Sequence, residues 1–88
     1  MFKSRIIVQL RKSILDPQGK AVEHGVHSLG YQQTKNVRIG KFIEMEIDAP
    51  NEDEAKRVTE EVCKKLLANP VMEDFTYTIE KVSNNGQG

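Results

Sequence analysis

The residue types best suited to chemistry lie between Leu15 and Tyr31, in the stretch LDPQGKAVEHGVHSLGY. The adjacent Gly19 and Lys20 could in principle hold a phosphate, because backbone amides and a lysine bind phosphate at helix starts. They lack the earlier glycine and the following Ser or Thr of a phosphate-binding loop. Pro17 also removes one amide from the helix start. We therefore favour a helix with well-defined ends over a nucleotide site.

Two histidines in the same stretch, His24 and His27, share the outer face of the helix with Glu23, and a metal ion could use the two histidines. Structural zinc sites need four protein ligands and catalytic ones need three, and no further ligand is suggested elsewhere in the chain. Solvated or interfacial histidines are the better interpretation. The single cysteine, Cys63, lies at the edge of an apolar helix stripe without a cationic partner, which predicts a small residue at the border of the core.

Composition restricts the classes of function. The chain of 88 residues is long enough for one domain with a small core, and its 13 Lys and Arg balance 13 Asp and Glu. Balanced charge and few aromatic residues argue against nucleic acid and membrane partners. The apolar run Ile6–Val8 is too short for a signal peptide, and one cysteine fits a reducing compartment, so we expect a cytoplasmic protein.

Hydrophobic periodicity predicts the elements that must position these residues. Asp16 and Pro17 are typical of a helix start, and Gly30 of a helix end. The expected elements are a strand at Phe2–Arg11, a helix at Pro17–Leu29, strands at Lys35–Ile39 and Lys41–Asp48, a helix from a capping box at Asn51 to Asn69-Pro70, and a strand through Phe75–Glu80.

This βαββαβ order favours an α+β fold, a ferredoxin-like two-layer sandwich. It implies right-handed parallel crossovers and a four-stranded, antiparallel-type sheet with both helices on one face. Residues 1–82 form the single domain, and we expect the polar tail, residues 83–88, to be disordered.

The other sheet face has no helix to cover it, so we predict a homodimer or a dimer of dimers formed through that face. The first strand and the strand at 41–48 are expected to be neighbours, which places Lys3, Arg5 and Arg11 beside Glu44, Glu46 and Asp48. The candidate residues for self-association are Arg5, Ile7, Phe42 and Glu44.

A basic corner at Arg38, Gly40 and Lys41 is the remaining candidate for function. A turn at the glycine between two strands would aim both cations outward from the sheet edge, where loops often carry function. The same residues could equally form an ordinary basic turn. No nucleophile, base and oxyanion donor come together anywhere in the chain, so catalysis by this chain alone is not expected.

Several segments together resemble a known family. They are Asp16–Val22 (DPQGKAV), His27–Gly30 (HSLG) and Val37–Lys41 (VRIGK), followed by the alternating strand that begins Phe42-Ile43-Glu44. In order and spacing they are similar to PurS, the small-subunit family of phosphoribosylformylglycinamidine (FGAM) synthase. The resemblance covers nearly the whole chain, and only Gln32–Thr34 and the polar tail depart from it.

The resemblance implies a non-catalytic subunit of an enzyme of purine (IMP) synthesis, which converts formylglycinamide ribonucleotide (FGAR) to FGAM with ATP and glutamine. In that family a large synthetase subunit binds ATP and magnesium, and a glutaminase subunit releases ammonia. The small subunit binds no cofactor and no metal; it bridges the other two and supports ammonia transfer. The candidate partner-interface residues are Asp16, Gln18, Lys20, His24, His27, Arg38, Gly40 and Lys41.

Other classes share the element order. An ACT-like regulatory module would bind a small molecule near a glycine after the first strand, where this chain has Lys12–Asp16. An acylphosphatase-like enzyme would need an arginine-bearing anion cradle at the same place. An RNA-binding sheet would need several aromatic residues on its open face, where only Phe42 is expected.

Overall fold

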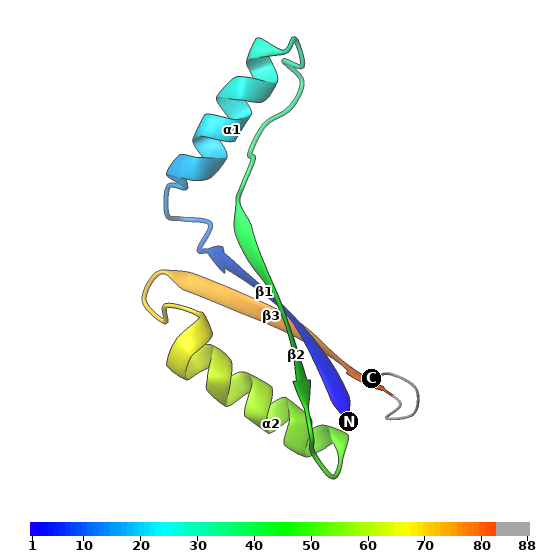
Figure 1. Cartoon of the computed structure of the whole chain (residues 1–88). Helices are drawn as coiled ribbons and strands as arrows, with labels where there is room; N and C mark the ends of the chain where they lie inside the picture. The colour runs from blue at the N-terminus through cyan, green and yellow to red at the C-terminus, as the bar shows by residue number, and fades with distance from the viewer. Residues whose placement is uncertain (83–88) are drawn as a thin grey trace.

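The computed structural model describes residues 1–82, and the predicted disordered tail, 83–88, lies outside the described residues. Its elements are β1 (Phe2–Leu10), α1 (Pro17–Ser28), β2 (Gly40–Ile47), α2 (Glu52–Val62), a π-helical turn (Cys63–Leu67) and β3 (Glu73–Lys81). In Figure 1, α2 lies along one side of the strands, whereas α1 extends beyond the end of the sheet. None of the helices within residues 1–82 has the length and apolar character needed to cross a membrane.

The sheet has three strands in the order β2-β1-β3, and both pairs are antiparallel. The prediction of a four-stranded sheet with parallel crossovers is therefore wrong. The error lies in residues 35–39, which are not a strand. The amides of Val37 and Ile39 donate to the carboxylates of Glu23 and Asp16 and not to a neighbouring strand.

The core lies between the sheet and α2. Phe2, Ile6 and Val8 of β1 are buried, and Ala55 and Cys63 pack on them from the α2 side. Cys63 was expected at the border of the core, but its side chain is fully buried. The helix was expected to run to Asn69-Pro70; instead α2 gives way at residue 63 to a wider π turn.

The predicted N-cap of α2 is confirmed, because the Asn51 Oδ1 accepts the Glu54 amide at 2.9 Å. The reciprocal half of the capping box is not formed. The Glu54 carboxylate instead binds Arg57, which also binds Glu61. The outer face of α2 is thus a row of ion pairs in solvent, of a kind that contributes little to stability.

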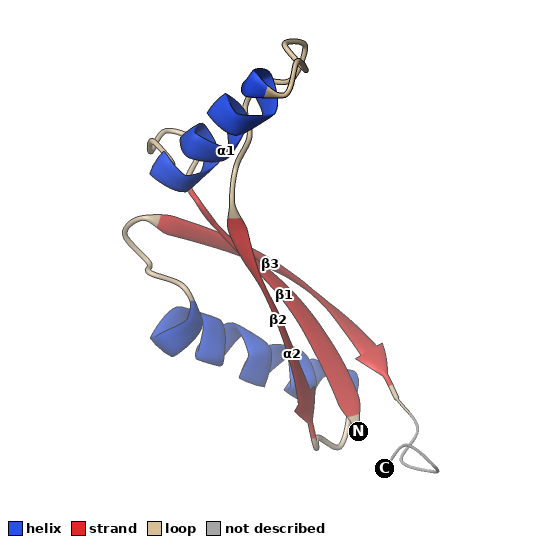
Figure 2. Cartoon of the chain, turned by 45° about the horizontal axis from the view of Figure 1, so that its top comes forward, coloured by secondary structure: helices blue, strands red, loops and turns tan. Residues whose placement is uncertain are grey.

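Helix α1 has its predicted bounds to within one residue, with Asp16 as N-cap, Pro17 at its first position and Gly30 at φ 103° after its end. The prediction that α1 packs on the face of the sheet is wrong. Figure 2 shows α1 and the segment that returns from it to β2, residues 31–39, projecting away from the strands. We call residues 31–39 the returning segment. We call residues 15–39 the arm. Its apolar stripe does not reach the core: Val22 is 44% exposed and Leu29 76%.

Candidate functional site at the junction of the arm and the sheet

Asp16 joins the two ends of the arm. One carboxylate oxygen accepts the Gly19 amide at 3.0 Å, and the other accepts the Ile39 amide at 2.7 Å. These bonds to Ile39 and Gly19 lower the pKa of the Asp16 carboxyl below its ordinary value. A lowered pKa means that the ionised form stabilises the fold at neutral pH, and that this contribution is lost as the pH falls through the folded-state pKa. Asp16 is 5% exposed, although it lies at a helix start.

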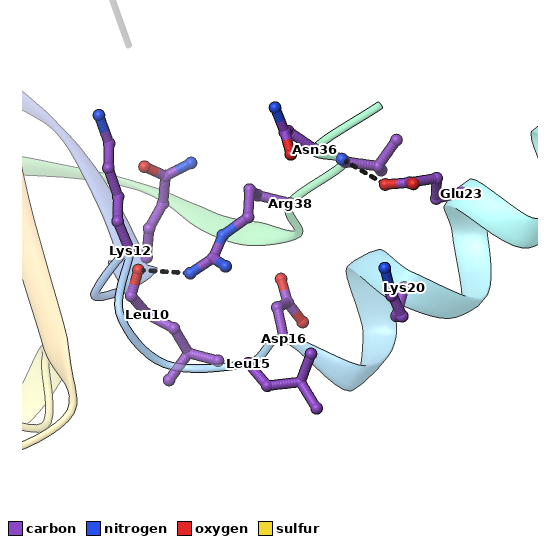
Figure 3. Close-up of a pocket in the computed structure, with 10 residues that line it drawn as sticks. Leu10, Lys12, Leu15, Asp16, Lys20, Glu23, Asn36 and Arg38 are labelled. Atoms are coloured by element: carbon purple, nitrogen blue, oxygen red, sulfur yellow. Dashed lines mark hydrogen bonds between the residues drawn. The ribbon is translucent and has the colours of Figure 1, made fainter. Parts of the chain in front are cut away.

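Arg38 ties the arm to the end of β1. Its guanidinium donates to three backbone carbonyls, those of Leu10 at 3.1 Å, Arg11 at 2.9 Å and Ile14 at 3.1 Å. In Figure 3, Arg38 points from the returning segment toward Leu10, with Asp16 close by. The expected outward aim of Arg38 is wrong, because its guanidinium turns back onto these three carbonyls, of which that of Arg11 also accepts the Ile14 amide. We call Leu10–Asp16 and Val37–Ile39 the junction.

The arm is also closed on itself. Glu23 accepts the Val37 amide at 3.0 Å, and this bond lowers the pKa of the Glu23 carboxyl. The His27 Nε2 lies 2.7 Å from the Thr34 carbonyl, which can only accept, so this nitrogen carries the proton. His24 is exposed and projects from the opposite face of α1 to Val22. His24 and His27 are three residues apart, and both line one open hollow together with Lys20, Ala21 and Glu23.

Two glycines permit close approach of the chain to itself. A Cβ built on Gly19 would lie 2.2 Å from the Val37 carbonyl oxygen and 3.0 Å from the Arg38 Cα. A Cβ on Gly40 would lie 2.8 Å from the Val8 carbonyl oxygen. The first turn of α1 is thus packed directly on the returning segment.

Of the cations at the basic corner, Lys41 is the one that projects. Its Nζ lies 3.4 Å from the Leu67 carbonyl and 3.9 Å from a Glu73 carboxylate oxygen, and the side chain is more than half exposed. Gln18 and Lys20 are exposed on the arm. These three side chains remain accessible to a partner.

Replacing Arg38 and Lys41 separately should distinguish their roles. We expect Arg38→Ala to lower the free energy of unfolding by about 1–2 kcal/mol, since it removes three hydrogen bonds from a charged donor. Lys41→Ala should change it by under about 0.5 kcal/mol. Urea unfolding followed by circular dichroism measures both. Equal effects of the two substitutions would contradict the role given to Arg38.

A pocket of about 440 Å³ opens at the junction (Figure 3). Lys12, Lys20 and Arg38 line it together with Asp16 and Glu23, so its charge is mixed. The acids already accept backbone amides, and Arg38 is held by carbonyls. In residues 1–82 no three His, Cys, Asp or Glu side chains gather as metal ligands.

The sheet face opposite α2 carries the predicted charge pairs. Arg5 binds Glu44 at 3.2 Å and also contacts Glu80 from β3. Ile7 and Phe42 face one another across β1 and β2 and are 46% and 61% exposed. We call this surface the open face.

Arg11 was placed wrongly. It lies at the far end of β1 from Asp48 and pairs with Asp74 instead. The register of the antiparallel β1–β2 pair explains this, because it sets Phe2 opposite Ile47 and Gln9 opposite Gly40.

Sequence reasoning missed the contacts that Glu23, Gly19 and Asp16 make with residues 37–39. The bonds of Glu23 and Asp16 join a side chain to a backbone amide 14 and 23 positions away, and Gly19 approaches the Val37 backbone. No local pattern encodes such a contact. The one available signal was the concentration of Asp, Pro and Gly at residues 16–19, which indicates a tightly specified turn.

Comparison with known proteins gives one consistent result. Residues 3–81 match the family model for PurS, phosphoribosylformylglycinamidine (FGAM) synthase. The PurS subunit of this synthase from Bacillus subtilis (strain 168) is 45% identical over 82 residues, which span 93% of this chain and 96% of the relative.

Solved structures agree with the sequence match. A crystal structure of Methanocaldococcus jannaschii PurS, described as one of the subunits of formylglycinamide ribonucleotide amidotransferase, superposes with a TM-score of 0.84 at 38% identity, covering 94% of this chain and 100% of that one. A chain of the Thermotoga maritima PurLQS structure gives 0.83 at 33% identity, covering 90% and 96%.

Proposed function

This chain belongs to the PurS family of FGAM synthase, an enzyme of purine biosynthesis, and we propose that it acts there as a non-catalytic subunit. In this role it bridges the glutaminase and synthetase subunits and supports the transfer of ammonia from glutamine for the ATP-dependent conversion of FGAR to FGAM. ATP and magnesium belong to the large subunit and not to this chain. A cytoplasmic location fits the single reduced thiol.

The observation that supports this proposal is that the polar side chains that could act in catalysis are already bonded within the chain. Asp16, Glu23 and Arg38 are engaged by backbone groups and so are not free to act on a substrate. The Tyr77 hydroxyl donates to Glu60 at 2.6 Å, and this bond raises the pKa of Tyr77 to about 12. Burial raises the pKa of the Cys63 thiol, which disfavours the nucleophilic thiolate.

The surfaces that remain suit contacts with other chains. The exposed Gln18, Lys20, His24 and Lys41 are the candidates for contact with the larger subunits. The open face, with Arg5, Ile7, Phe42 and Glu44, is the candidate for self-association into a dimer or a dimer of dimers. An ACT-like regulatory role, the alternative with the same element order, is not favoured, because the family match covers residues 3–81.

An assay of the isolated chain tests the absence of catalysis. The purified chain should release no ammonia from glutamine and no phosphate from ATP above a buffer blank, because no activated side chains come together in it. A substitution at the junction pocket, Lys12→Ala, is the control for any trace activity. Turnover by the isolated chain that Lys12→Ala abolishes would contradict the proposal.

A further inference from the structure

Two of the cations that line the junction pocket have no partner in the described part of the chain. Lys12 follows β1, Lys20 lies near the start of α1, and both residues are exposed. In the view of Figure 3, their ammonium groups lie on opposite sides of Arg38. The lysines that form ion pairs within residues 1–82 are Lys41, Lys56 and Lys65, and neither pocket lysine is among them.

The acids of the pocket, in contrast, are already bonded within the chain. Both oxygens of Asp16 accept backbone amides, from Ile39 and Gly19, and one oxygen of Glu23 accepts the amide of Val37. These bonds lower the pKa of both carboxyls. Each lysine ammonium carries three donors and no acceptor. The unused hydrogen-bonding capacity of the pocket is therefore mainly that of donors, which an anion satisfies.

The rest of the pocket suits the organic part of a ligand. Leu10, Leu15 and Val37 supply apolar surface, and the side-chain amides of Gln9 and Asn36 can bond hydroxyl groups. The pocket volume of about 440 Å³ lies within the range of roughly 300–1,000 Å³ that is usual for small-molecule sites. Asn36 is also the one non-glycine residue with a positive φ, 60°, in residues 1–82, and such conformations are concentrated at binding sites.

We propose that the junction pocket binds a small organic phosphate monoester, and that Lys12 and Lys20 contact its phosphate group. At neutral pH this group carries up to two negative charges, which match two unpaired ammonium groups. The start of α1 does not supply the contact, because Pro17 has no amide and the Gly19 amide bonds Asp16. This binding site goes beyond the proposed bridging function.

The position of the pocket gives the ligand a structural effect. Its walls come from the end of β1, from the first turns of α1 and from the returning segment, which are the two ends of the arm and the strand that carries it. A ligand bound there therefore ties the arm to the sheet, and it stabilises the folded chain by its binding free energy.

Titration of the full chain with ribose 5-phosphate, a soluble compound of this class, tests the site. Amide chemical shifts of the ¹⁵N-labelled chain should change in a saturable manner at Lys12, Lys20 and Asn36, with a dissociation constant of about 1 mM or tighter. Ribose lacks the phosphate and should give no saturable change. Inorganic phosphate should bind at least about threefold more weakly than the ester, because it makes no contact with the apolar wall.

Replacement of single lysines tests which cations bind the phosphate. Lys12→Ala and Lys20→Ala should each weaken binding by about threefold to tenfold, since each removes one charged contact. Lys56→Ala is the matched control, because it removes an exposed cation from α2, where Lys56 pairs with Glu52 outside the pocket. These substitutions leave the bonds of Asp16 and Arg38 in place, and circular dichroism verifies that each chain is folded.

Four results would each overturn the proposal. They are no saturable shift with ribose 5-phosphate, equal affinity for ribose or inorganic phosphate, an equal loss of affinity with Lys56→Ala and Lys12→Ala, and tighter binding of a short phosphoserine peptide than of ribose 5-phosphate. The last would assign the pocket to a phosphorylated protein and not to a small metabolite. Glutamine-dependent FGAM formation, measured without any added phosphate ester, tests the bridging function separately.

Discussion

Gly19→Ala is expected to destabilise this chain by about 2–3 kcal/mol, although alanine normally stabilises a helix relative to glycine. The added Cβ would meet the Val37 carbonyl oxygen at 2.2 Å, with the Arg38 Cα and an Asp16 carboxylate oxygen each at 3.0 Å. The backbone on the far side cannot move freely, because Ile39 is bonded to Asp16 and Arg38 to the end of β1. The substitution therefore forces the junction apart.

Gly25→Ala is the matched control in the same helix. A Cβ at Gly25 meets nothing within 4 Å, so the ordinary gain of about 0.5–1 kcal/mol should appear. Both substitutions are compared at the same chain concentration, so that contacts between copies affect them equally. Thermal unfolding should show a fall of about 10 °C or more for the first and a small rise for the second. A rise for both would mean that the first turn of α1 does not pack on the returning segment.

Much of the fold was predictable because its signals are local. Asp16, Pro17 and Gly30 define the ends of α1 through cap and backbone preferences that act within a few residues. The alternation along β1 fixed which of its side chains are buried. The neighbouring positions of Arg5 and Glu44 also followed, because the predicted order of elements placed their strands side by side.

The arm was not predictable because periodicity does not name the surface that buries an apolar stripe. The stripe of α1 was assigned to its own sheet, yet Val22 and Leu29 are exposed. Residues 35–39 have the alternation of a strand, but carboxylates from Asp16 and Glu23 take up their amides. The backbone of Asn36, at φ 60°, also interrupts the extended conformation, and the alternation of side chains does not reveal which group each amide bonds to.

The candidate site was found in part. Asp16 and Arg38 were both named as partner-interface candidates, and the structure brings them together at the junction. Their contacts are with the chain itself, which sequence reasoning did not foresee. Contact of any of the candidate residues with a larger subunit stays a prediction.

The second large effect concerns the source of nitrogen. If this chain holds the glutaminase and synthetase subunits together, omitting it should reduce glutamine-dependent FGAM formation by about a hundredfold, because linked binding sites gain roughly 10²–10⁴ in effective affinity. Ammonia supplied directly needs no bridge. Ammonium-dependent FGAM formation by the synthetase subunit should therefore change by less than about twofold when the chain is omitted.

Lys41→Ala and the open-face variant Phe42→Lys refine this test. The first removes an accessible cation from a candidate contact with the larger subunits, whereas the second alters the candidate surface for self-association. Neither residue is buried in the core, so both variant chains should remain folded. A lower glutamine-dependent rate with Lys41→Ala alone would show that the complex requires the contact with the larger subunits. A lower rate with Phe42→Lys alone would show that it requires self-association.

The most direct test of the bridging function is the ratio of two initial rates, FGAM formation with glutamine and with ammonium chloride, measured with and without this chain at fixed amounts of both larger subunits. The proposal predicts that adding the chain raises the glutamine rate about a hundredfold and leaves the ammonium rate nearly unchanged. An equal rise in both rates would contradict it, because the chain would then act on the synthetase reaction itself and not on the delivery of ammonia.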